Sequence, residues 1–332
     1  MKKFINDPEQ VVNEMLEGFL LVHTPHLRLL TTSRVVVRRE APIQGKVGLV
    51  SGGGSGHEPT FSGYIGSGLI DAVAIGEIFS SPSAQQFYDA IASVNSGKGV
   101  ICIYGNYSGD IMNVDLAMEM AQEEGIRVEQ VIVNDDVASS PPERIDNRRG
   151  VAGQIMVLKT AGAKAGEKAS LKEVLEVAQR TNANTRTMGV AISPCTVPTA
   201  GEPTFTLAED EMELGVGEHG EPGLKTIKLK SADETTRILV NHIIPDLPFK
   251  SGDEVAVLVN SFGGTPLSEL YIIYRKVVQL LSPQHITIYK SYLGEYLTSL
   301  EMAGFSLTLT KLDAELKRLL DAPAGGPVFG QR

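Results

Sequence analysis

Two histidines lie in glycine-rich segments, where an imidazole could act on a ligand. His57 ends the segment Ser-Gly-Gly-Gly-Ser-Gly-His at 51–57, and His219 lies between glycines in Gly-Val-Gly-Glu-His-Gly-Glu-Pro-Gly at 215–223. Glycine leaves the ring uncovered and lets backbone N–H groups approach a ligand closely. His219 is therefore a candidate nucleophile, and the alternative for both residues is a turn histidine without a role. The remaining histidines lack such a setting and are assigned no role: His23, His26, His242 and His285.

Asp110 closes a second polar segment, Gly-Asn-Tyr-Ser-Gly-Asp at 105–110, which follows an apolar run and precedes a helical pattern. In open α/β sheets, ligands bind beyond the carboxyl ends of the strands, so this segment and the one before His57 are expected to face one crevice. Asp110 could then serve as a base. An aspartate before a helix is also a common N-cap, so its position leaves both interpretations open.

Acidic residues are plentiful, but their spacing predicts no metal site. They include Asp135, Asp136, Glu209, Asp210, Glu211 and Glu213. Runs of this kind are usually a solvated face, and no His-x-x-x-His, Cys-x-x-Cys or calcium-loop spacing occurs. Arg148 and Arg149 precede a run of small residues that starts a helix. They could bind an anion there, or serve only capping and solubility.

Composition and charge exclude several classes of protein. The chain has 332 residues, of which 42% are hydrophobic and 21% charged, as in a globular protein that buries a core. Its formal net charge of -10 argues against nucleic acid binding, which needs clustered Lys and Arg. The 2 cysteines cannot form the disulfide framework of a secreted domain, and neither a signal peptide nor a membrane-spanning run is evident. A cytoplasmic protein without nucleic acid or membrane partners is expected.

Short apolar runs alternate with helical patterns, which predicts an α/β fold. The runs read as buried strands at 46–51, 100–104, 130–134, 187–193, 254–260 and 286–289. Helices are expected at 111–124, 171–180, 235–244 and 267–281. An opening helix follows Asp7, an N-cap before Pro8, and a strand near 305–310 could run antiparallel.

The length of the chain favours two domains over one. We place the boundary before the strand at 187–193, which gives an N-terminal α/β domain at 1–184 and a C-terminal α/β domain at 185–332. The stretch 194–223 is rich in Pro, Gly and Glu and is expected to be one long loop, either functional or disordered. The tail at 322–332 is expected to be loosely held.

Several segments together resemble the substrate-binding subunit of the dihydroxyacetone kinases. In chain order they are SGGGSGHEP, GEIFSSP at 76–82, GNYSGD, RRGVAG, CTVP at 195–198, FTLAEDEMELGVGEHGEPG and TSLEMAGFSLTL at 298–309. The likeness covers almost the whole chain, and several of these motifs are long and unusual. The resemblance implies the fold of that family, in which two domains each hold a mostly parallel or mixed sheet flanked by helices.

The resemblance also implies roles for individual residues. In that family the histidine of the G-x-H-G-E-P-G loop holds the ketone carbon of the substrate as a hemiaminal, here His219. The aspartate of the N-Y-x-G-D motif, here Asp110, is the base on the hydroxyl that is phosphorylated. The G-H-E-P histidine, here His57, orients the carbonyl oxygen or donates to it, and Gly54 and Ser81 match positions that contact the bound ketone.

Two positions depart from the family pattern beside the inferred substrate. The usual lysine before Asn-Tyr is Gly105 here, and the usual apolar residue before the loop histidine is Glu218. The first change removes a cation and a long side chain, and the second adds an acceptor for hydroxyl hydrogen bonds. Both are expected to be substrate-binding positions. A four-carbon ketose such as erythrulose thereby becomes an alternative to dihydroxyacetone.

Partners follow from the same resemblance. The glycines before His57 are not followed by the Gly-Lys-Ser/Thr of a P-loop, so no cofactor is expected on this chain. Bacterial members with separate subunits hold ADP or ATP with Mg on a nucleotide-binding kinase subunit, which a phosphotransferase-system protein recharges from phosphoenolpyruvate. The chain is expected to form a homodimer and to be inactive alone. Some relatives instead bind the ketone as ligand-sensing co-activators of a transcription regulator, and retention of Asp110 favours the enzyme.

Overall fold

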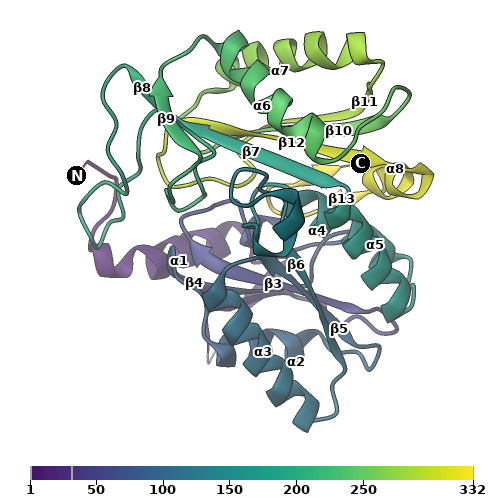
Figure 1. The fold of residues 1–332 in the computed structure, drawn as a ribbon. Coiled ribbons are helices and arrows are strands. Elements are labelled where there is room, and N and C mark those ends of the chain that lie inside the picture. The colour runs from purple at the N-terminus through teal and green to yellow at the C-terminus, as the bar shows by residue number, and fades with distance from the viewer. Residues whose placement is uncertain (1, 31–32, 332) are drawn as a thin grey trace.

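Two mixed sheets of six strands each form the framework of the computed structural model (Figure 1), which describes residues 2–30 and 33–331. The first sheet has the order β1-β2-β4-β3-β5-β6, and its strands from β4 to β6 are parallel. Its strands are β1 (Leu27–Leu29), β2 (Val35–Arg38), β3 (Gly48–Ser55), β4 (Ala72–Ile78), β5 (Val100–Gly105) and β6 (Val128–Val133).

The second sheet has the order β11-β10-β12-β7-β8-β9, and only β10 and β11 pair in parallel among its described strands. Its strands are β7 (Thr185–Ala191), β8 (Glu211–Leu214), β9 (Lys225–Lys228), β10 (Glu254–Ser261), β11 (Thr287–Gly294) and β12 (Gly304–Leu312). The predicted antiparallel strand near 305–310 is β12, which lies between β10 and β7.

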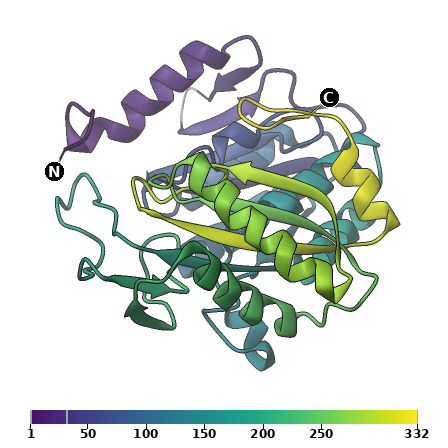
Figure 2. The same cartoon turned by 90° about the horizontal axis from the view of Figure 1, so that it is seen from above.

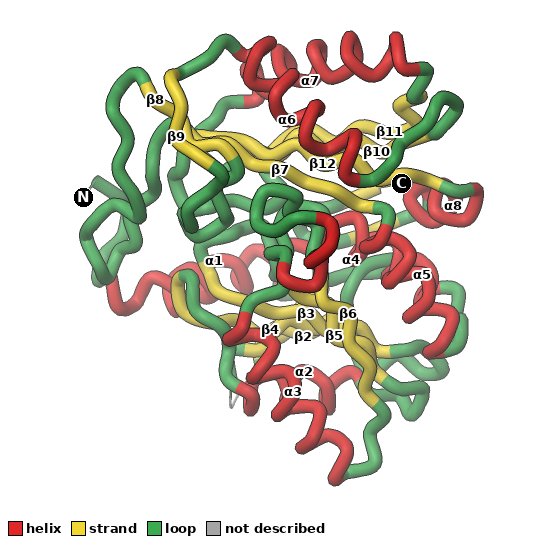
Figure 3. Tube along the Cα trace, in the orientation of Figure 1, coloured by secondary structure: helices red, strands yellow, loops and turns green. Residues whose placement is uncertain are grey.

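Helices cover and separate the two sheets (Figures 1 and 3). The outer face of the first sheet carries α2 (Ala84–Val94) and α3 (Ser108–Glu123). Between the sheets lie α4 (Gln154–Gly166), α5 (Leu171–Ala183) and α8 (Ala314–Asp321). The outer face of the second sheet carries α6 (Ala232–Asp246) and α7 (Leu267–Leu281), which Figure 2 shows from above.

The central strands are apolar at successive positions because both faces of their sheet are covered. In β2, Val35 and Val37 pack in the core beneath α2 and α3, whereas Val36 belongs to the core shared with α4 and α5. Successive side chains of a strand point to opposite faces, so a strand between two helical layers needs an apolar residue at each position.

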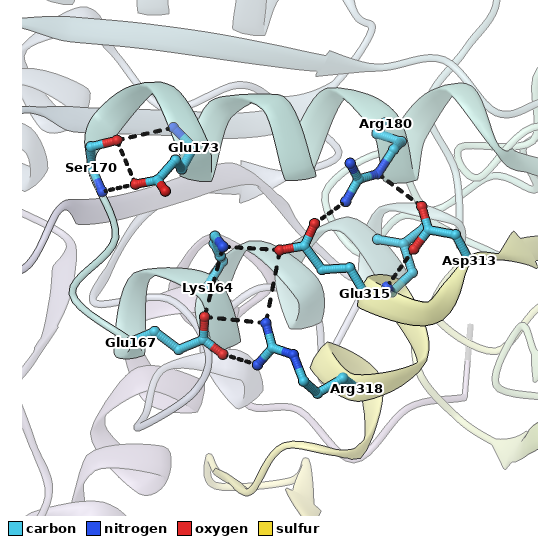
Figure 4. Close-up of polar contacts among 9 residues, drawn as sticks. Lys164, Glu167, Ser170, Glu173, Arg180, Asp313, Glu315 and Arg318 are labelled. Carbon is cyan, nitrogen blue, oxygen red and sulfur yellow. Dashed lines mark hydrogen bonds and ion pairs between the residues drawn. The ribbon is translucent and has the colours of Figure 1, made fainter.

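Helices α2, α5 and α6 each begin with a capping box. A serine hydroxyl accepts from the backbone N–H three residues on, and the Gln or Glu at that position accepts from the serine N–H. The pairs are Ser83 with Gln86, Ser170 with Glu173, and Ser231 with Glu234; Figure 4 shows the second.

Helix α8 is tied to the middle layer by an ion-pair network (Figure 4). Glu315 accepts hydrogen bonds from Lys164 at 2.9 Å and from Arg180 at 2.5 Å. Arg318 pairs with Glu167 at the end of α4. These partly exposed contacts connect α8 to α4 and α5.

The expectation of a loosely held tail was wrong. After α8, the N–H of Gly325 donates to the carbonyl of Ser67 at 2.9 Å, and β13 (Ala324–Gly325) pairs with β14 (Gly330–Gln331). Phe329 is 7% exposed and packs against the rings of Tyr64 and Tyr292. One buried aromatic side chain anchors a segment whose Gly and Pro content indicated a free end.

The predicted helices and strands are otherwise confirmed. Each of the six predicted strands overlaps a strand of the sheets, and Asp7 caps a short 3-10 helix, Pro8–Gln10, that leads into α1 (Val11–His23). The single long loop predicted at 194–223 was wrong in part, because it contains β8. The domain bounds at 184 and 185 coincide with the start of β7 and stay a prediction. Over residues 2–30 and 33–331, no helix has the length and apolar character needed to cross a membrane.

Candidate active site

His57 lies just beyond the end of β3, where glycines allow the chain to turn. A Cβ at Gly54 would lie 2.7 Å from the nitrogen of Ser80, and Gly56 has a φ of +98°, which favours glycine. His57 turns inward and is 1% exposed. Its Nδ1 lies 2.8 Å from the carbonyl oxygen of Thr298, so Nδ1 carries the proton and Nε2 the lone pair. Burial lowers the pKa of His57 to about 3, so the ring is neutral at pH 7.

His219 lies in the loop between β8 and β9, where Glu221 holds its ring. Oε1 of Glu221 lies 2.7 Å from Nδ1 of His219, and Oε2 accepts the backbone N–H of His219 at 2.9 Å. Burial alone would raise the pKa of Glu221, but its hydrogen bonds with His219 outweigh burial and lower the pKa to about 2. The carboxylate therefore fixes the proton on Nδ1 and leaves the lone pair on Nε2.

The imidazole of His219 is surrounded by three other rings. The centroids of His57 and Tyr107 lie 4.8 Å from that of His219, and the centroid of Phe79 lies 5.0 Å away. All three meet it nearly edge-on. These rings follow β3, β4 and β5, so the carboxyl ends of three neighbouring strands meet the loop of the second sheet here. Edge-to-face contacts of this kind hold the imidazole in one orientation.

Asp110 lies in the first turn of α3 but is not its N-cap, a position that Tyr107 occupies. The residue is 9% exposed, and its Oδ1 has no hydrogen-bond partner among the described residues. Burial raises the pKa of Asp110 to about 6, although Ser81 and His219 oppose the shift. An unpaired carboxyl oxygen of this pKa can take a proton near neutral pH, which favours the base over the cap. Ser81 lies close to Asp110 and accepts a hydrogen bond from Asn113 at 3.2 Å.

Glu218 points into the protein, since it is only 5% exposed. Its Oε2 finds no hydrogen-bond partner in the part of the chain that the structure describes. Burial and then the charge of Glu221 raise the pKa of Glu218 well above its usual range, which favours the protonated carboxyl. The sequence indicated only an added acceptor, whereas a protonated carboxyl can also donate. One ligand atom each of His57, Glu218 and His219 lies within 4.8 Å of the other two.

Gly105 ends β5 beside the ring of Tyr107. A Cβ at Gly105 would lie 3.2 Å from two carbons of that ring and 3.3 Å from the carbonyl oxygen of Gly150. A lysine here would therefore press on Tyr107, which packs against His219. Gly105 shapes the site through this ring.

Arg148 and Arg149 are both bound within the protein. Arg148 is fully buried and donates to both carboxylate oxygens of Asp246, at 2.8 and 2.5 Å. Arg149 donates to Asp136 and to the carbonyl oxygen of Gly215, both at 2.8 Å. The sequence left two roles open for these arginines, anion binding and capping with solubility. Their contacts within the protein match neither role. Arg149 instead anchors the start of the loop that carries His219.

Residues outside the predicted set complete the site. Glu221 stands inside the motif that carries His219, but spacing alone does not show that its carboxylate returns to the ring. Tyr107 and Phe79 likewise lie within the motifs GNYSGD and GEIFSSP. Their aromatic character was the available signal, and only the fold shows that both face His219.

Comparison with known proteins identifies the family. The family model of the Dak1 domain matches residues 17–328. The dihydroxyacetone-binding subunit DhaK of PTS-dependent dihydroxyacetone kinase 2 from Listeria innocua is 42% identical over 330 residues, which cover 99% of each chain. The chain belongs to the dihydroxyacetone kinase family. An L-erythrulose kinase of this family from Pectobacterium atrosepticum is 41% identical, and the chain spans 56% of its length.

Solved structures of the dihydroxyacetone kinase family share the fold. The dihydroxyacetone kinase operon co-activator Dha-DhaQ superposes with a TM-score of 0.90 at 34% identity, covering 96% of this chain and 98% of that chain. The dihydroxyacetone kinase from C. freundii in complex with AMP-PNP and Mg2+ gives a TM-score of 0.91 at 32% identity, and this chain covers 61% of it. A kinase and a co-activator thus have the same architecture, so fold alone does not separate these functions.

Proposed function

We propose that this chain is the ketose-binding subunit of a dihydroxyacetone-type kinase and captures a short keto sugar as a hemiaminal on Nε2 of His219. One observation carries the proposal: Glu221 holds Nδ1 of His219 at 2.7 Å, which leaves the Nε2 lone pair free to attack. The ring lies among residues of the three motifs that carry the resemblance to the family. A neutral imidazole held in this way is a competent nucleophile.

The capture step balances with the groups present. Nε2 of His219 forms a bond to the ketone carbon, and the π electrons move to the carbonyl oxygen. The Nδ1 proton stays on the ring, and the carboxylate of Glu221 stabilises the positive charge that develops there. Glu218, whose pKa is raised by burial, supplies a proton to the oxygen. Neutral His57 cannot donate from Nε2, so it orients the adduct by accepting the new hydroxyl proton in a hydrogen bond.

Phosphoryl transfer then requires a base and a donor. Asp110 takes the proton of the terminal hydroxyl, and holding the substrate covalently lowers the entropic part of the barrier. The donor is a nucleotide bound with Mg2+ on a partner subunit, recharged by a phosphotransferase-system protein from phosphoenolpyruvate. Two relatives support a phosphoenolpyruvate-dependent kinase. One is the PTS-dependent subunit of Listeria innocua, and the other is the PEP-dependent subunit of Escherichia coli, which is 40% identical to this chain over 353 residues. The chain acts as a cytoplasmic homodimer and is inactive without its partners.

A four-carbon ketose is the favoured substrate within this proposal. Glu218 adds a hydrogen-bonding group beside His219, and Gly105 lets the ring of Tyr107 lie close to the backbone. Gly54 and Ser81 contact the ketone from the ends of β3 and β4. Similarity to a D-erythrulose kinase of Mycolicibacterium smegmatis, 41% identical over 329 residues, agrees with this choice, although the chain spans 56% of that protein.

The deciding experiment measures phosphorylated product from the reconstituted system. The chain is mixed with erythrulose or dihydroxyacetone, a nucleotide-bearing kinase subunit and a phosphoenolpyruvate-charged donor. The proposal expects ketose phosphate to form, and to be absent when the chain is omitted. The second candidate is a ligand-sensing co-activator, because the co-activator Dha-DhaQ shares the fold with a TM-score of 0.90. Ketose capture without any phosphorylated product would support that candidate instead.

A further inference from the structure

Three side chains of types that can ligate a metal lie close together in the site. His57, Glu218 and His219 each offer one such atom, a ring nitrogen or a carboxylate oxygen, and these three atoms lie within 4.8 Å of one another. His57 and Glu218 are 1% and 5% exposed. Within residues 2–30 and 33–331, neither Nε2 of His57 nor Oε2 of Glu218 has a hydrogen-bond partner. Buried polar atoms are usually satisfied, so two unsatisfied atoms on residues of one such cluster indicate a ligand.

Both imidazoles are oriented as metal ligands are. Nδ1 of His57 donates to the carbonyl oxygen of Thr298 at 2.8 Å, and Nδ1 of His219 donates to the carboxylate of Glu221 at 2.7 Å. Metal-ligating histidines almost always donate their other ring N–H to a carbonyl or carboxylate in this way. Each Nε2 is therefore left with its lone pair.

We propose that His57, Glu218 and His219 form a binding site for a divalent transition-metal cation, with Zn2+ as the best match. Two imidazoles and one carboxylate are a ligand set that Zn2+ accepts in catalytic sites, with a fourth position left to water. Ca2+ and Mg2+ prefer oxygen ligands and fit this set poorly. A bound dication is the largest local charge and favours the ionised form of Glu218. Spacing along the sequence could not reveal the site, because its ligands come from distant segments.

Metal binding and ketose capture exclude each other, because both use the lone pair on Nε2 of His219. This consequence rests on the proposed function, whereas the metal site does not. A bound Zn2+ would hold the chain in a form that cannot accept ketose. Glu218 is needed for Zn2+ binding, because an apolar residue at that position would leave only two ligands.

Isothermal titration of the full chain with ZnCl2, after removal of metal by a chelator, tests the site without any ketose. The wild type is expected to bind one Zn2+ per chain. Glu221→Gln should weaken binding by about 10- to 100-fold, the usual cost of losing an outer partner of a ligand. Glu218→Gln and His219→Ala remove ligands and should weaken it more than Glu221→Gln. His242→Gln, at an exposed histidine outside the cluster, should bind as the wild type does.

Circular dichroism of each variant separates loss of a ligand from loss of the fold. The proposal is overturned if the wild type has no saturable site. It is also overturned if Glu218→Gln and His219→Ala, while folded, bind Zn2+ as tightly as the wild type. If both variants unfold, anomalous diffraction from a wild-type crystal soaked in ZnCl2 decides. A peak between the three side chains supports the site, and peaks only elsewhere refute it. Failure of ketose phosphorylation in the reconstituted system bears only on the proposed function.

Discussion

Glu221 accepts from both the ring Nδ1 and the backbone N–H of His219, two residues before it, at 2.7 and 2.9 Å. One carboxylate therefore fixes the tautomer of the proposed nucleophile and the conformation of the loop that carries it. Glu221 is a positioning residue, because it acts on the substrate through His219.

Glu221→Gln is expected to weaken ketose capture by about 10- to 100-fold, the range for one lost charge-assisted hydrogen bond. A glutamine has one oxygen and one NH2, so it can satisfy either the ring or the backbone N–H but not both. Where the NH2 faces the ring, the proton moves to Nε2 and the nucleophile is lost. Calorimetric titration with dihydroxyacetone measures the effect. Glu202→Gln, at an exposed glutamate of the preceding loop, serves as the control and should bind normally.

Asp110→Asn should keep ketose binding and lose turnover by about 10²- to 10⁴-fold, the usual contribution of a positioned base. The base acts when ionised, so kcat of the wild type should fall as the pH drops through about 6, the pKa to which burial raises Asp110. The variant should lack this acidic limb. Asp115→Asn, at an exposed position of the same helix, is the matched control. Parallel loss of binding and turnover would make Asp110 a structural residue.

The wild type should prefer erythrulose over dihydroxyacetone in kcat/KM by about two- to tenfold, the value of one neutral hydrogen bond. Glu218 can supply that bond because it is buried in the site and burial raises its pKa, which favours the protonated carboxyl. The pair of changes Gly105→Lys and Glu218→Ile should move specificity back toward dihydroxyacetone. Competition between the two ketoses with reconstituted partners checks this. Preference for dihydroxyacetone in both proteins would show that neither departure sets specificity.

Asp246→Asn should lower the free energy of unfolding by about 3–5 kcal/mol, the cost of leaving a buried charge without its partner. Asp246 is 7% exposed at its side chain and binds Arg148, which is fully buried, and Arg186. Burial would raise the pKa of Asp246, but the two arginines outweigh it and lower the pKa. Its contribution is therefore present at neutral pH and is lost as the pH falls through the folded-state pKa.

Urea unfolding of the wild type and of Asp246→Asn measures the loss of stability. Asp210→Asn breaks a pair with Lys228 in which both side chains are exposed, and it should leave the free energy of unfolding nearly unchanged. Similar losses for the two variants would contradict a special role for the buried pair.

The sequence predicts most of the buried strands and long helices because their apolar periodicity is strong, but it does not predict β2, β4 or α2. It does not predict β8, which interrupts a stretch rich in Pro, Gly and Glu, and it does not predict the anchoring of Phe329. Local composition is polar or flexible in both places, and tertiary contacts decide the outcome. The motifs around His57, Asp110 and His219 indicate residues that could react. Only the fold shows that the carboxylate of Glu221 contacts the ring of His219 and that Glu218 is buried. The spacing of residues along the sequence does not determine where a side chain points or how far it is buried.

A crystal of the wild-type chain soaked with dihydroxyacetone tests the central claim most directly. The account predicts continuous electron density between Nε2 of His219 and the carbonyl carbon of the ketose, with a tetrahedral geometry at that carbon. A His219→Ala crystal soaked in parallel should show no covalent adduct. Ketose bound with a planar carbonyl and no bond to His219, or density joining it to another residue, would contradict the account.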